Sequence, residues 1–415
     1  MSQFPKNLQY YKFCAYGFLK NLKFFEIIFL LYLKETGISY LQIGLLYSVR
    51  QITKNILEIP SGLIADVLGR KRALLLAIFS YIVSFNIFYF AGSLIFFISA
   101  MVCFGIGEAF RSGTHKAMII DYLHQNNMSE KKSAYYGSTR SWSQFGSAVS
   151  SLLAIPIVFI NGSYKILFLA AAVPYLLDLL IISSYPKSLN GSTQSARSPI
   201  TSKFKETFLD FFSMFKDRKI MRALFSEASY IALYKGSKDY LQPILKMYAL
   251  SMPFFLSYGN EERTVTALGI TFFAIFLINS FTSRNAWKLE KHLNSLPAAN
   301  NLAYIIGVSA AGAAGLFYQY EMTAMAAVVF ILIYVIQNLR RPLMVSYIGE
   351  IIPNKVMASG LSAGSQLETI IIAVFAPVLG LLIDTSGLGL GLFYSSLIFA
   401  SFFVFARLPN QLKID

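Results

Sequence analysis

Charged side chains recur at helical spacing inside a long apolar stretch of this sequence. Arg50, Lys54 and Glu58 follow one another at intervals of four residues, so they share one face of a predicted helix. A charge at the centre of a membrane-spanning helix costs about 2.5–3.5 kcal/mol and is usually retained for function. The stripe is therefore typical of a helix that lines a path for a polar solute or an ion.

Similar charges interrupt other apolar stretches. We expect the central ones to bind solute in a cavity, and these are Lys23, Glu26, Arg50, Lys54, Arg111, Lys235, Lys238 and Asp239. Buried carboxylates can carry protons and histidine titrates near neutrality, which gives the proton-coupling candidates Glu26, Glu58, Glu108, His115 and Glu368. The alternatives are structural ion pairs, a structural histidine, and basic side chains that snorkel to an interface.

The balance of these central charges favours an anionic or zwitterionic solute. With Glu108 and Glu368 included they comprise six basic and four acidic residues, and an unpaired buried cation needs a counter-charge. Arg50 and Arg111 suit a carboxylate or a phosphate, because a guanidinium group can bind either with two parallel hydrogen bonds.

Composition places the whole chain in a membrane. Of the 415 residues, 55% are hydrophobic and 14% charged, and the mean hydropathy is +0.55. The net charge of +15 would suggest nucleic acid in a soluble protein, but here basic cytoplasmic loops explain it. Cys14 and Cys103 suggest no disulfide, and the sequence shows no clustered metal ligands, P-loop or nucleophile motif. We expect no enzyme activity, no cofactor and no metal.

A membrane-spanning helix needs about 20 apolar residues. On that basis the chain is an all-α polytopic membrane protein with twelve segments, Phe13–Leu33, Leu41–Ile64, Ala73–Ala91, Leu94–Tyr122, Ser133–Ile160, Ile166–Tyr185, Met221–Leu250, Val265–Trp287, Pro297–Phe317, Thr323–Ile348, Val356–Ile383 and Leu388–Ala406. Charges should make hydropathy alone underrate the first, second, fourth, seventh and tenth. Basic loops alternate with short or acidic ones, which predicts that both termini are cytoplasmic.

The segments fall into two halves. Residues 1–185 form a predicted six-helix bundle, residues 186–220 a cytoplasmic linker, and residues 221–415 a second six-helix bundle. Lys203–Lys219 alternates apolar and basic residues and could form an amphipathic helix. Residues 114–123 and 132–137 align with residues 339–348 and 355–360, so the bundles are pseudo-symmetric. Such a duplication is typical of secondary transporters, whose binding site lies between the repeats.

The turn after the second segment carries a family resemblance. Gly62, Asp66, Gly69, Arg70 and Lys71 fit the pattern G-x-x-x-D-x-x-G-R-[KR], and with twelve segments in two halves the chain resembles the major facilitator superfamily. The resemblance implies that these five residues gate the cytoplasmic side. Asp66 and Arg70 would pair with each other or with helix termini of the other half. It also implies that segments three, six, nine and twelve lie outermost; Asp178 is the single charge in their cores.

Further positions narrow the resemblance. Glu58–Gly62 with Ser112–Thr114 looks like a bacterial subgroup that resembles drug exporters and whose substrates are mostly unassigned. Three departures count against drug/proton antiport or against a symmetric gate. Met101 replaces an arginine, Ser150 and Ser151 replace a Gly-Pro pair, and residues 282–288 lack the glycines and acid of the first turn.

These observations predict a secondary active transporter of the inner (plasma) membrane. It would move a polar, anionic or zwitterionic small organic solute by alternating access, driven by protons or another ion, and act as a monomer without nucleic-acid partners. Two alternatives remain open: proton-coupled efflux of multiple amphipathic drugs, and a membrane receptor or scaffold that has a transporter fold but does not transport.

Overall fold

The computed structural model describes residues 4–190, 217–253, 257–352 and 357–409. Every regular element within those ranges is a helix, and they contain no strand. The predicted all-α membrane fold is confirmed. The linker helix expected at Lys203–Lys219 falls almost entirely outside the described residues. The description resumes at residue 217, and the next helix begins at Arg218.

Eight stretches of helix are long and apolar enough to cross a membrane. They are Arg70–Phe90, Leu94–Gln125, Ala134–Asn161, Ile166–Ser183, Asn260–Asn285, Leu296–Gln319, Thr323–Ile351 and Ser362–Ala406. The last covers predicted segments eleven and twelve, with a non-helical residue, Gly387, between them. Segments two and seven do not qualify, as predicted, whereas segment one consists of helices of 12 and 7 residues, which are too short to span a membrane singly. Segments four and ten do qualify, so that part of the prediction was wrong: their charges lie near one end and leave a sufficient apolar window.

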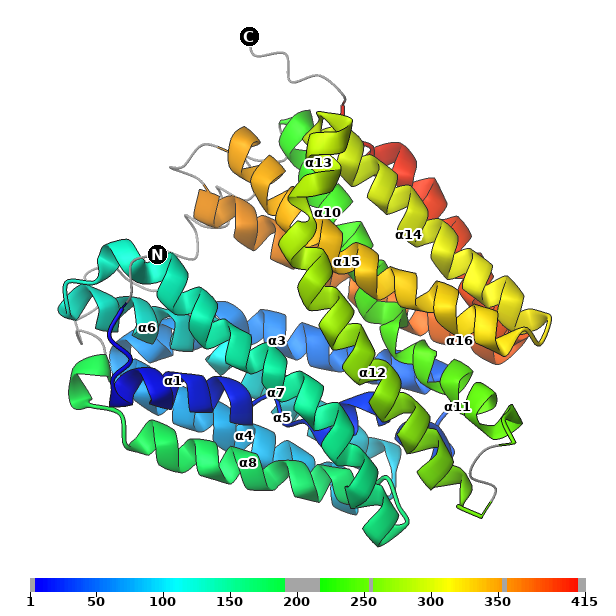
Figure 1. Ribbon diagram of the computed structural model, residues 1–415, viewed down its shortest axis with the longest axis horizontal. Coiled ribbons are helices and arrows are strands. Elements are labelled where there is room, and N and C mark those ends of the chain that lie inside the picture. The colour runs from blue at the N-terminus through cyan, green and yellow to red at the C-terminus, as the bar shows by residue number, and fades with distance from the viewer. Residues whose placement is uncertain (1–3, 191–216, 254–256, 353–356, 410–415) are drawn as a thin grey trace. The chain divides into compact units, whose positions relative to one another are not determined.

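The described residues divide into two compact units, which are treated separately. Of the described residues, unit 1 comprises 4–28, 49–190 and 257–273. Its helices are α1 (Leu8–Leu19), η1 (Phe24–Ile27), the later part of α3 (Tyr40–Leu68), α4 (Arg70–Phe90), α5 (Leu94–Arg111), α6 (Thr114–Gln125), η2 (Ser129–Lys131), α7 (Lys132–Asn161), α8 (Ile166–Ser183), η3 (Lys187–Asn190) and the start of α12 (Asn260–Asn285). Helix α4 packs between α5 and α8, and α1 packs against α7 and α8 (Figure 1).

Of the described residues, unit 2 comprises 29–48, 217–253, 274–352 and 357–409. Its helices are α2 (Phe29–Glu35), the start of α3, α10 (Arg218–Ser237), η4 (Lys238–Tyr240), α11 (Leu241–Ser251), the rest of α12, α13 (Trp287–Leu293), α14 (Leu296–Gln319), α15 (Thr323–Ile351) and α16 (Met357–Ala406). Helix α14 packs against α15 and α16, and α10 packs against α16.

Unit 2 includes a stretch from the first half of the chain, residues 29–48. The Asp384 carboxylate accepts hydrogen bonds from the backbone N–H groups of Tyr40 (3.0 Å) and Leu41 (2.8 Å), which caps the N-terminus of α3. The Gln242 side chain accepts one from Leu30 N at 2.9 Å. The two-bundle division at residues 1–185, 186–220 and 221–415 stays a prediction.

The first helix of each sequence half is broken. Helix α1 ends at Leu19 and the chain resumes in η1 after Lys23, whose φ of −97° and ψ of 75° are not helical. Helix α10 ends at Ser237 and gives way to the short η4. A helix break releases backbone carbonyl groups that need new partners inside a membrane. Tyrosine hydroxyls supply them: Tyr175 donates to Lys20 O at 2.7 Å, and Tyr334 to Lys238 O at 2.6 Å.

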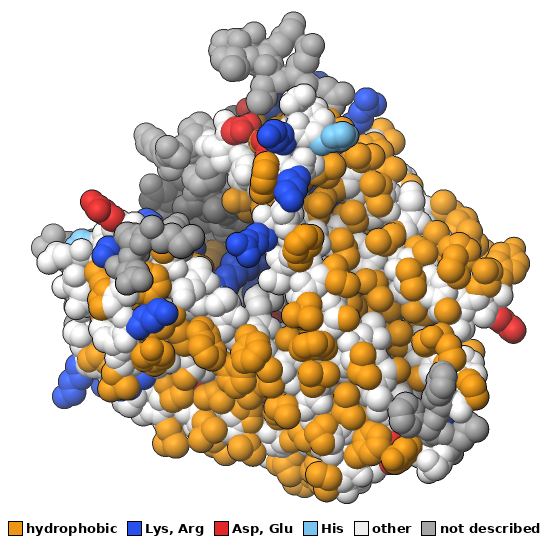
Figure 2. All heavy atoms as spheres, viewed as in Figure 1, with side chains coloured by type: hydrophobic (Ala, Val, Ile, Leu, Met, Phe, Trp, Pro, Cys, Tyr) orange, Lys and Arg blue, Asp and Glu red, His pale blue; other side chains and the backbone are white. Residues whose placement is uncertain are grey.

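Hydrophobic side chains cover most of the face drawn in Figure 2. Helix α8 illustrates how the sequence divides its faces, since Val173, Leu176 and Leu180 are exposed whereas Tyr175 and Asp178 are buried. An apolar exposed face is what a lipid-facing helix requires.

Candidate functional site

The helix break in unit 1 carries two lysines that are held by aromatic rings. Lys23 Nζ lies 5.1 Å from the centre of the Phe104 ring and 5.6 Å from that of Tyr81, and Lys20 Nζ lies 5.4 Å from that of Tyr16. Rings at these distances attract a cation without neutralising it. Neither lysine forms an ion pair with a described residue.

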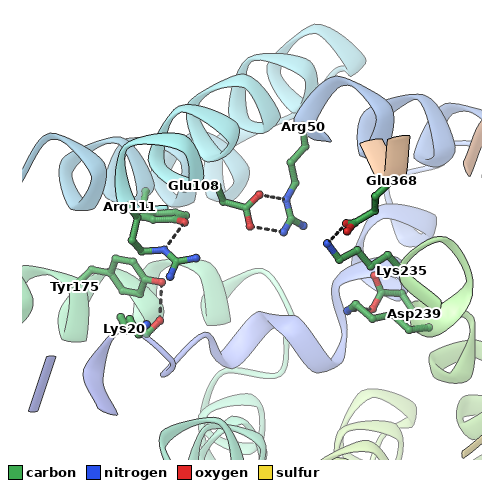
Figure 3. Close-up of polar contacts among 10 residues, drawn as sticks. Lys20, Arg50, Glu108, Arg111, Tyr175, Lys235, Asp239 and Glu368 are labelled. Carbon is green, nitrogen blue, oxygen red and sulfur yellow. Dashed lines mark hydrogen bonds and ion pairs between the residues drawn. The ribbon is translucent and has the colours of Figure 1, made fainter. Parts of the chain in front are cut away.

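Arg50 and Glu108 form a two-pronged ion pair between α3 and α5. Arg50 Nε and Nη2 donate to the two carboxylate oxygens at 3.1 and 2.7 Å, and the side chains point toward one another in Figure 3. The guanidinium carbon also lies 4.4 Å from the centre of the Phe104 ring. Gly105 lets the helices approach closely, because a Cβ there would meet the backbone oxygen of Arg50. Arg50 is thus already neutralised within unit 1.

Arg111 differs from Arg50 although both guanidinium groups were predicted to bind the solute. Arg111 Nε donates to the hydroxyl of Tyr81 at 3.1 Å, and no described carboxylate pairs with it. Tyr81 therefore contacts both Arg111 and Lys23, and Phe104 contacts both Lys23 and Arg50. We call Lys20, Lys23 and Arg111, which act on one another electrostatically, the cation cluster of unit 1.

The break in unit 2 carries acids and bases in pairs. Lys235 pairs with Glu368 (Figure 3), and Lys238 Nζ lies 2.7 Å from Asp239 Oδ1. The other oxygen of Asp239 accepts a hydrogen bond from Tyr47 at 2.8 Å. The predicted residues Lys235, Lys238, Asp239 and Glu368 therefore lie together, but unlike the cation cluster they are mutually compensated.

The other predicted residues of unit 1 lie around this centre or away from it. Lys54 is half-buried on α3 and contributes electrostatically to Glu108. Glu58, one turn further, accepts a hydrogen bond from Ser112 Oγ at 3.4 Å. Glu26 is exposed on η1. His115 stacks on Tyr16 at 4.0 Å and its Nε2 lies 3.3 Å from the hydroxyl of Tyr185. An aromatic enclosure of this kind also suits a structural histidine.

The glycine-and-arginine turn is fastened within unit 1. Arg70 pairs with Asp121 of α6, a partner that the sequence did not predict, and the side chain of Asp66 lies outside the described part of the chain. Lys71 Nζ binds the carbonyl oxygens of Ser183 (2.6 Å) and Tyr185 (3.0 Å) at the end of α8. These contacts tie α4 to α6 and α8, where a cation neutralises the negative end of a helix.

Gly69 occupies a position that requires glycine. Its φ is +95°, and the side-chain oxygen of Asn190 lies where a Cβ would project. The same oxygen accepts a hydrogen bond from Lys71 N at 3.2 Å. Gly62, in contrast, lies within α3, where a Cβ would project into open space. The backbone conformation and the contact with Asn190 therefore require glycine at position 69, whereas neither does so at position 62.

Sequence reasoning missed the aromatic partners of the site. Tyr81, Phe104 and Tyr175 hold the cations or cap a broken helix, but nothing in their spacing separates them from the rest of the 37 Phe and 25 Tyr residues of the chain. Asp178 was noticed only as an isolated charge. The structure adds that both carboxylate oxygens of Asp178 are buried without a hydrogen-bond partner among the described residues.

Comparison with known proteins decides the family. A family model of the Major Facilitator Superfamily matches residues 13–376. The chain belongs to the Major Facilitator Superfamily. A curated relative, the uncharacterized MFS-type transporter YxaM of Bacillus subtilis (strain 168), is 34% identical over 104 residues, which span 25% of this chain and only 26% of that relative. The resemblance drawn from the signature turn is confirmed.

Solved structures show that this superfamily member has the fold of membrane transporters, not of an enzyme. The nucleoside transporter NupG superposes with a TM-score of 0.74 at 14% identity, covering 97% of this chain and 98% of that one. A POT family transporter in complex with 5-aminolevulinic acid superposes with a TM-score of 0.73 at 16% identity, covering 96% and 95%. At such identities the likeness concerns the fold alone.

Proposed function

We propose that this protein is a secondary active transporter that moves a small anionic or zwitterionic organic solute by alternating access. The cation cluster of unit 1 supports the proposal most strongly. Lys20, Lys23 and Arg111 have no carboxylate partner among the described residues, whereas every charged group of the unit 2 break is paired. An uncompensated charge in a membrane is expensive unless a counter-charge enters, and a solute carboxylate or phosphate would supply it.

The geometry changes which arginine we expect to hold the solute. Arg50 already uses two N–H groups on Glu108, so a solute would have to compete with that carboxylate. Arg111 uses its Nε on a neutral phenol and keeps its terminal nitrogens available. Arg111, Lys23 and Lys20 are the proposed anion ligands, whereas Arg50, paired with Glu108, lies against the same Phe104 ring as Lys23 and has a positioning role.

The paired acids of unit 2 suit proton coupling. Lys235–Glu368 and Lys238–Asp239 are ion pairs in which a proton could replace the lysine at the carboxylate. Proton coupling belongs to the proposal, as do the inner-membrane location, the cytoplasmic termini and a monomeric state.

The proposed gate is the turn at Gly62, Asp66, Gly69, Arg70 and Lys71. Arg70 and Lys71 bind α6 and the end of α8, so a movement of α4 would have to rearrange these contacts during the cycle. We therefore propose that the turn controls the cytoplasmic end of unit 1.

A binding screen tests the solute class. The purified protein is heated with monocarboxylates, amino acids, sugar phosphates, nucleosides, 5-aminolevulinic acid and lipophilic cations, and a true ligand raises the melting temperature. We expect a hit among anions or zwitterions that disappears in Arg111→Gln. The matched control is Arg218→Gln, an exposed arginine at the start of α10, which should keep the hit.

Flux in proteoliposomes then separates the rival functions. Uptake of the hit driven by an imposed proton gradient supports the proposal. Proton-linked extrusion of lipophilic cations with no anion flux would replace it with drug efflux. Binding without flux in either direction would instead indicate a receptor or scaffold with a transporter fold.

A further inference from the structure

Asp178 is a carboxyl group inside unit 1 that the proposed solute site does not use. It is the only charged residue of α8, its exposed fraction is 0%, and neither of its oxygens has a hydrogen-bond partner among the described residues. The opposite face of α8, with Leu176, Leu177 and Leu180, is exposed. The helix therefore turns its single acid inward.

Asp178 shares a helix face with Tyr175, which contacts the break after α1. Tyr175 lies three residues earlier on α8, so both side chains share one helix face. Tyr175 donates its hydroxyl hydrogen to the carbonyl oxygen of Lys20, which joins this face of α8 to the break after α1 (Figure 3). Lys20 is the cation that acts electrostatically on Asp178, although the two form no ion pair.

Other ionisable groups surround this position on several elements. Three tyrosines interact electrostatically with Asp178: Tyr16 of α1, Tyr175 of α8 and Tyr185 in the segment after α8. Lys20 interacts in the same way with Lys23, with Arg111 of α5, with His115 of α6 and with Arg140 of α7. Tyr81 of α4 interacts with Tyr16 and Tyr175, and Glu26 of η1 interacts with Lys23. Lys20 is the basic member of this set that acts electrostatically on Asp178.

An ionised carboxylate without hydrogen bonds or an ion partner is strongly disfavoured in a buried site, whereas a protonated carboxyl group is tolerated far better. We propose that Asp178 holds a proton in this conformation and, when it releases that proton, forms an ion pair with Lys20. Proton binding at Asp178 thus leaves Lys20 available to an anion. Proton loss, in which the carboxyl O–H proton passes to water, gives Lys20 an internal partner.

This inference rests on the proposed function for its consequence: the proton and the anion would occupy unit 1 together. The sign follows from the competition. At low pH Asp178 is neutral, Lys20 is unpaired and an anion binds well. As the pH rises, the Asp178 carboxylate competes for Lys20 and anion binding weakens. A proton would then accompany each anion in the same direction.

Infrared spectroscopy of the solute-free protein tests the proton site directly. The purified full chain in nanodiscs should show the C=O stretch of a protonated carboxylic acid, which shifts in heavy water. Asp178→Asn should remove this band, and Asp178→Glu should move it. The control Glu130→Gln, which changes an exposed acid of η2, should retain it. Raising the pH should bleach the band.

Lys20→Met tests the partner in protein that keeps Asp178, and so remains informative if Asp178→Asn fails to fold. Without the lysine the ionised form loses its counter-charge, so the band should persist to higher pH than in the wild type. A wild type without the band, a band that survives in folded Asp178→Asn, or a Lys20→Met titration that does not move upward overturns the inference. Because no solute is present, this result is independent of the flux assays that decide the proposed function.

Discussion

The phenol of Tyr81 accepts a hydrogen bond from Arg111 Nε at 3.1 Å, and the same ring lies beneath Lys23 Nζ. One neutral side chain thereby holds two cations of unit 1 without cancelling the charge of either. Arg50, which reaches Glu108, shows the alternative arrangement on the neighbouring helix. Arg111, whose partner is a neutral phenol, is the arginine that we propose to bind solute. Arg50, whose partner is a carboxylate, has a positioning role.

Arg111 should matter for solute binding more than for stability. We expect Arg111→Gln to weaken binding of the screened anion about ten- to a hundredfold, the value of one or two hydrogen bonds between charged groups. Arg111→Lys should recover little, since an ammonium lacks the fork of N–H groups. Thermal-shift titrations measure the affinity. Equal affinity in wild type and Arg111→Gln would remove Arg111 from the site.

The Arg50–Glu108 pair should show coupling in a double-mutant cycle. Either Arg50→Gln or Glu108→Gln leaves one charge without its partner, so the double variant should be more stable than the sum of the two single losses implies. Because about a third of the Arg50 side chain is exposed, we expect a coupling free energy of only about 1–2 kcal/mol. Melting temperatures of the four proteins report it, and additivity would show that the pair contributes nothing to stability.

The tyrosines that cap the two broken helices offer matched variants. Tyr175→Phe and Tyr334→Phe each remove one hydroxyl and leave the carbonyl oxygen of Lys20 or Lys238 without that donor. An unsatisfied buried polar group costs about 1–3 kcal/mol, so both variants should melt earlier by similar amounts. Tyr136→Phe, a tyrosine of α7 whose hydroxyl donates to no described residue, is the control. If the three variants melt alike, these hydroxyls do not stabilise the breaks.

The two signature glycines should respond differently to the same substitution. Gly69→Ala forces a side chain into a backbone with φ of +95° and against Asn190, at a cost of about 1–3 kcal/mol. Gly62→Ala adds a methyl group to an unobstructed helical position and should be neutral or stabilising by up to about 1 kcal/mol. Comparing the two melting curves checks this directly. Asn190→Ala in the Gly69→Ala background should relieve only the contact, not the backbone strain.

The sequence alone determined the class of this protein. Apolar runs of spanning length, basic loops in alternation and the turn at Gly62, Asp66, Gly69, Arg70 and Lys71 sufficed for an all-α transporter fold of the Major Facilitator Superfamily. Membrane helices can be predicted this way because lipid requires each backbone to satisfy its own hydrogen bonds locally. The charges at Lys23, Arg50, Glu108, Arg111, Lys235 and Asp239 could be recognised for the same reason: each is costly where it stands.

Only the tertiary structure decided how those charges are compensated. Spacing along one helix cannot tell whether Arg50 meets Glu108 or a solute, why Arg111 meets a phenol, or that Arg70 pairs with Asp121, because each partner comes from another helix. Spacing also could not tell whether Asp178 faces water or is buried. In the structure it is buried, without a hydrogen-bond partner among the described residues. Partner choice depends on how helices pack against one another, and that information is distributed over the whole chain.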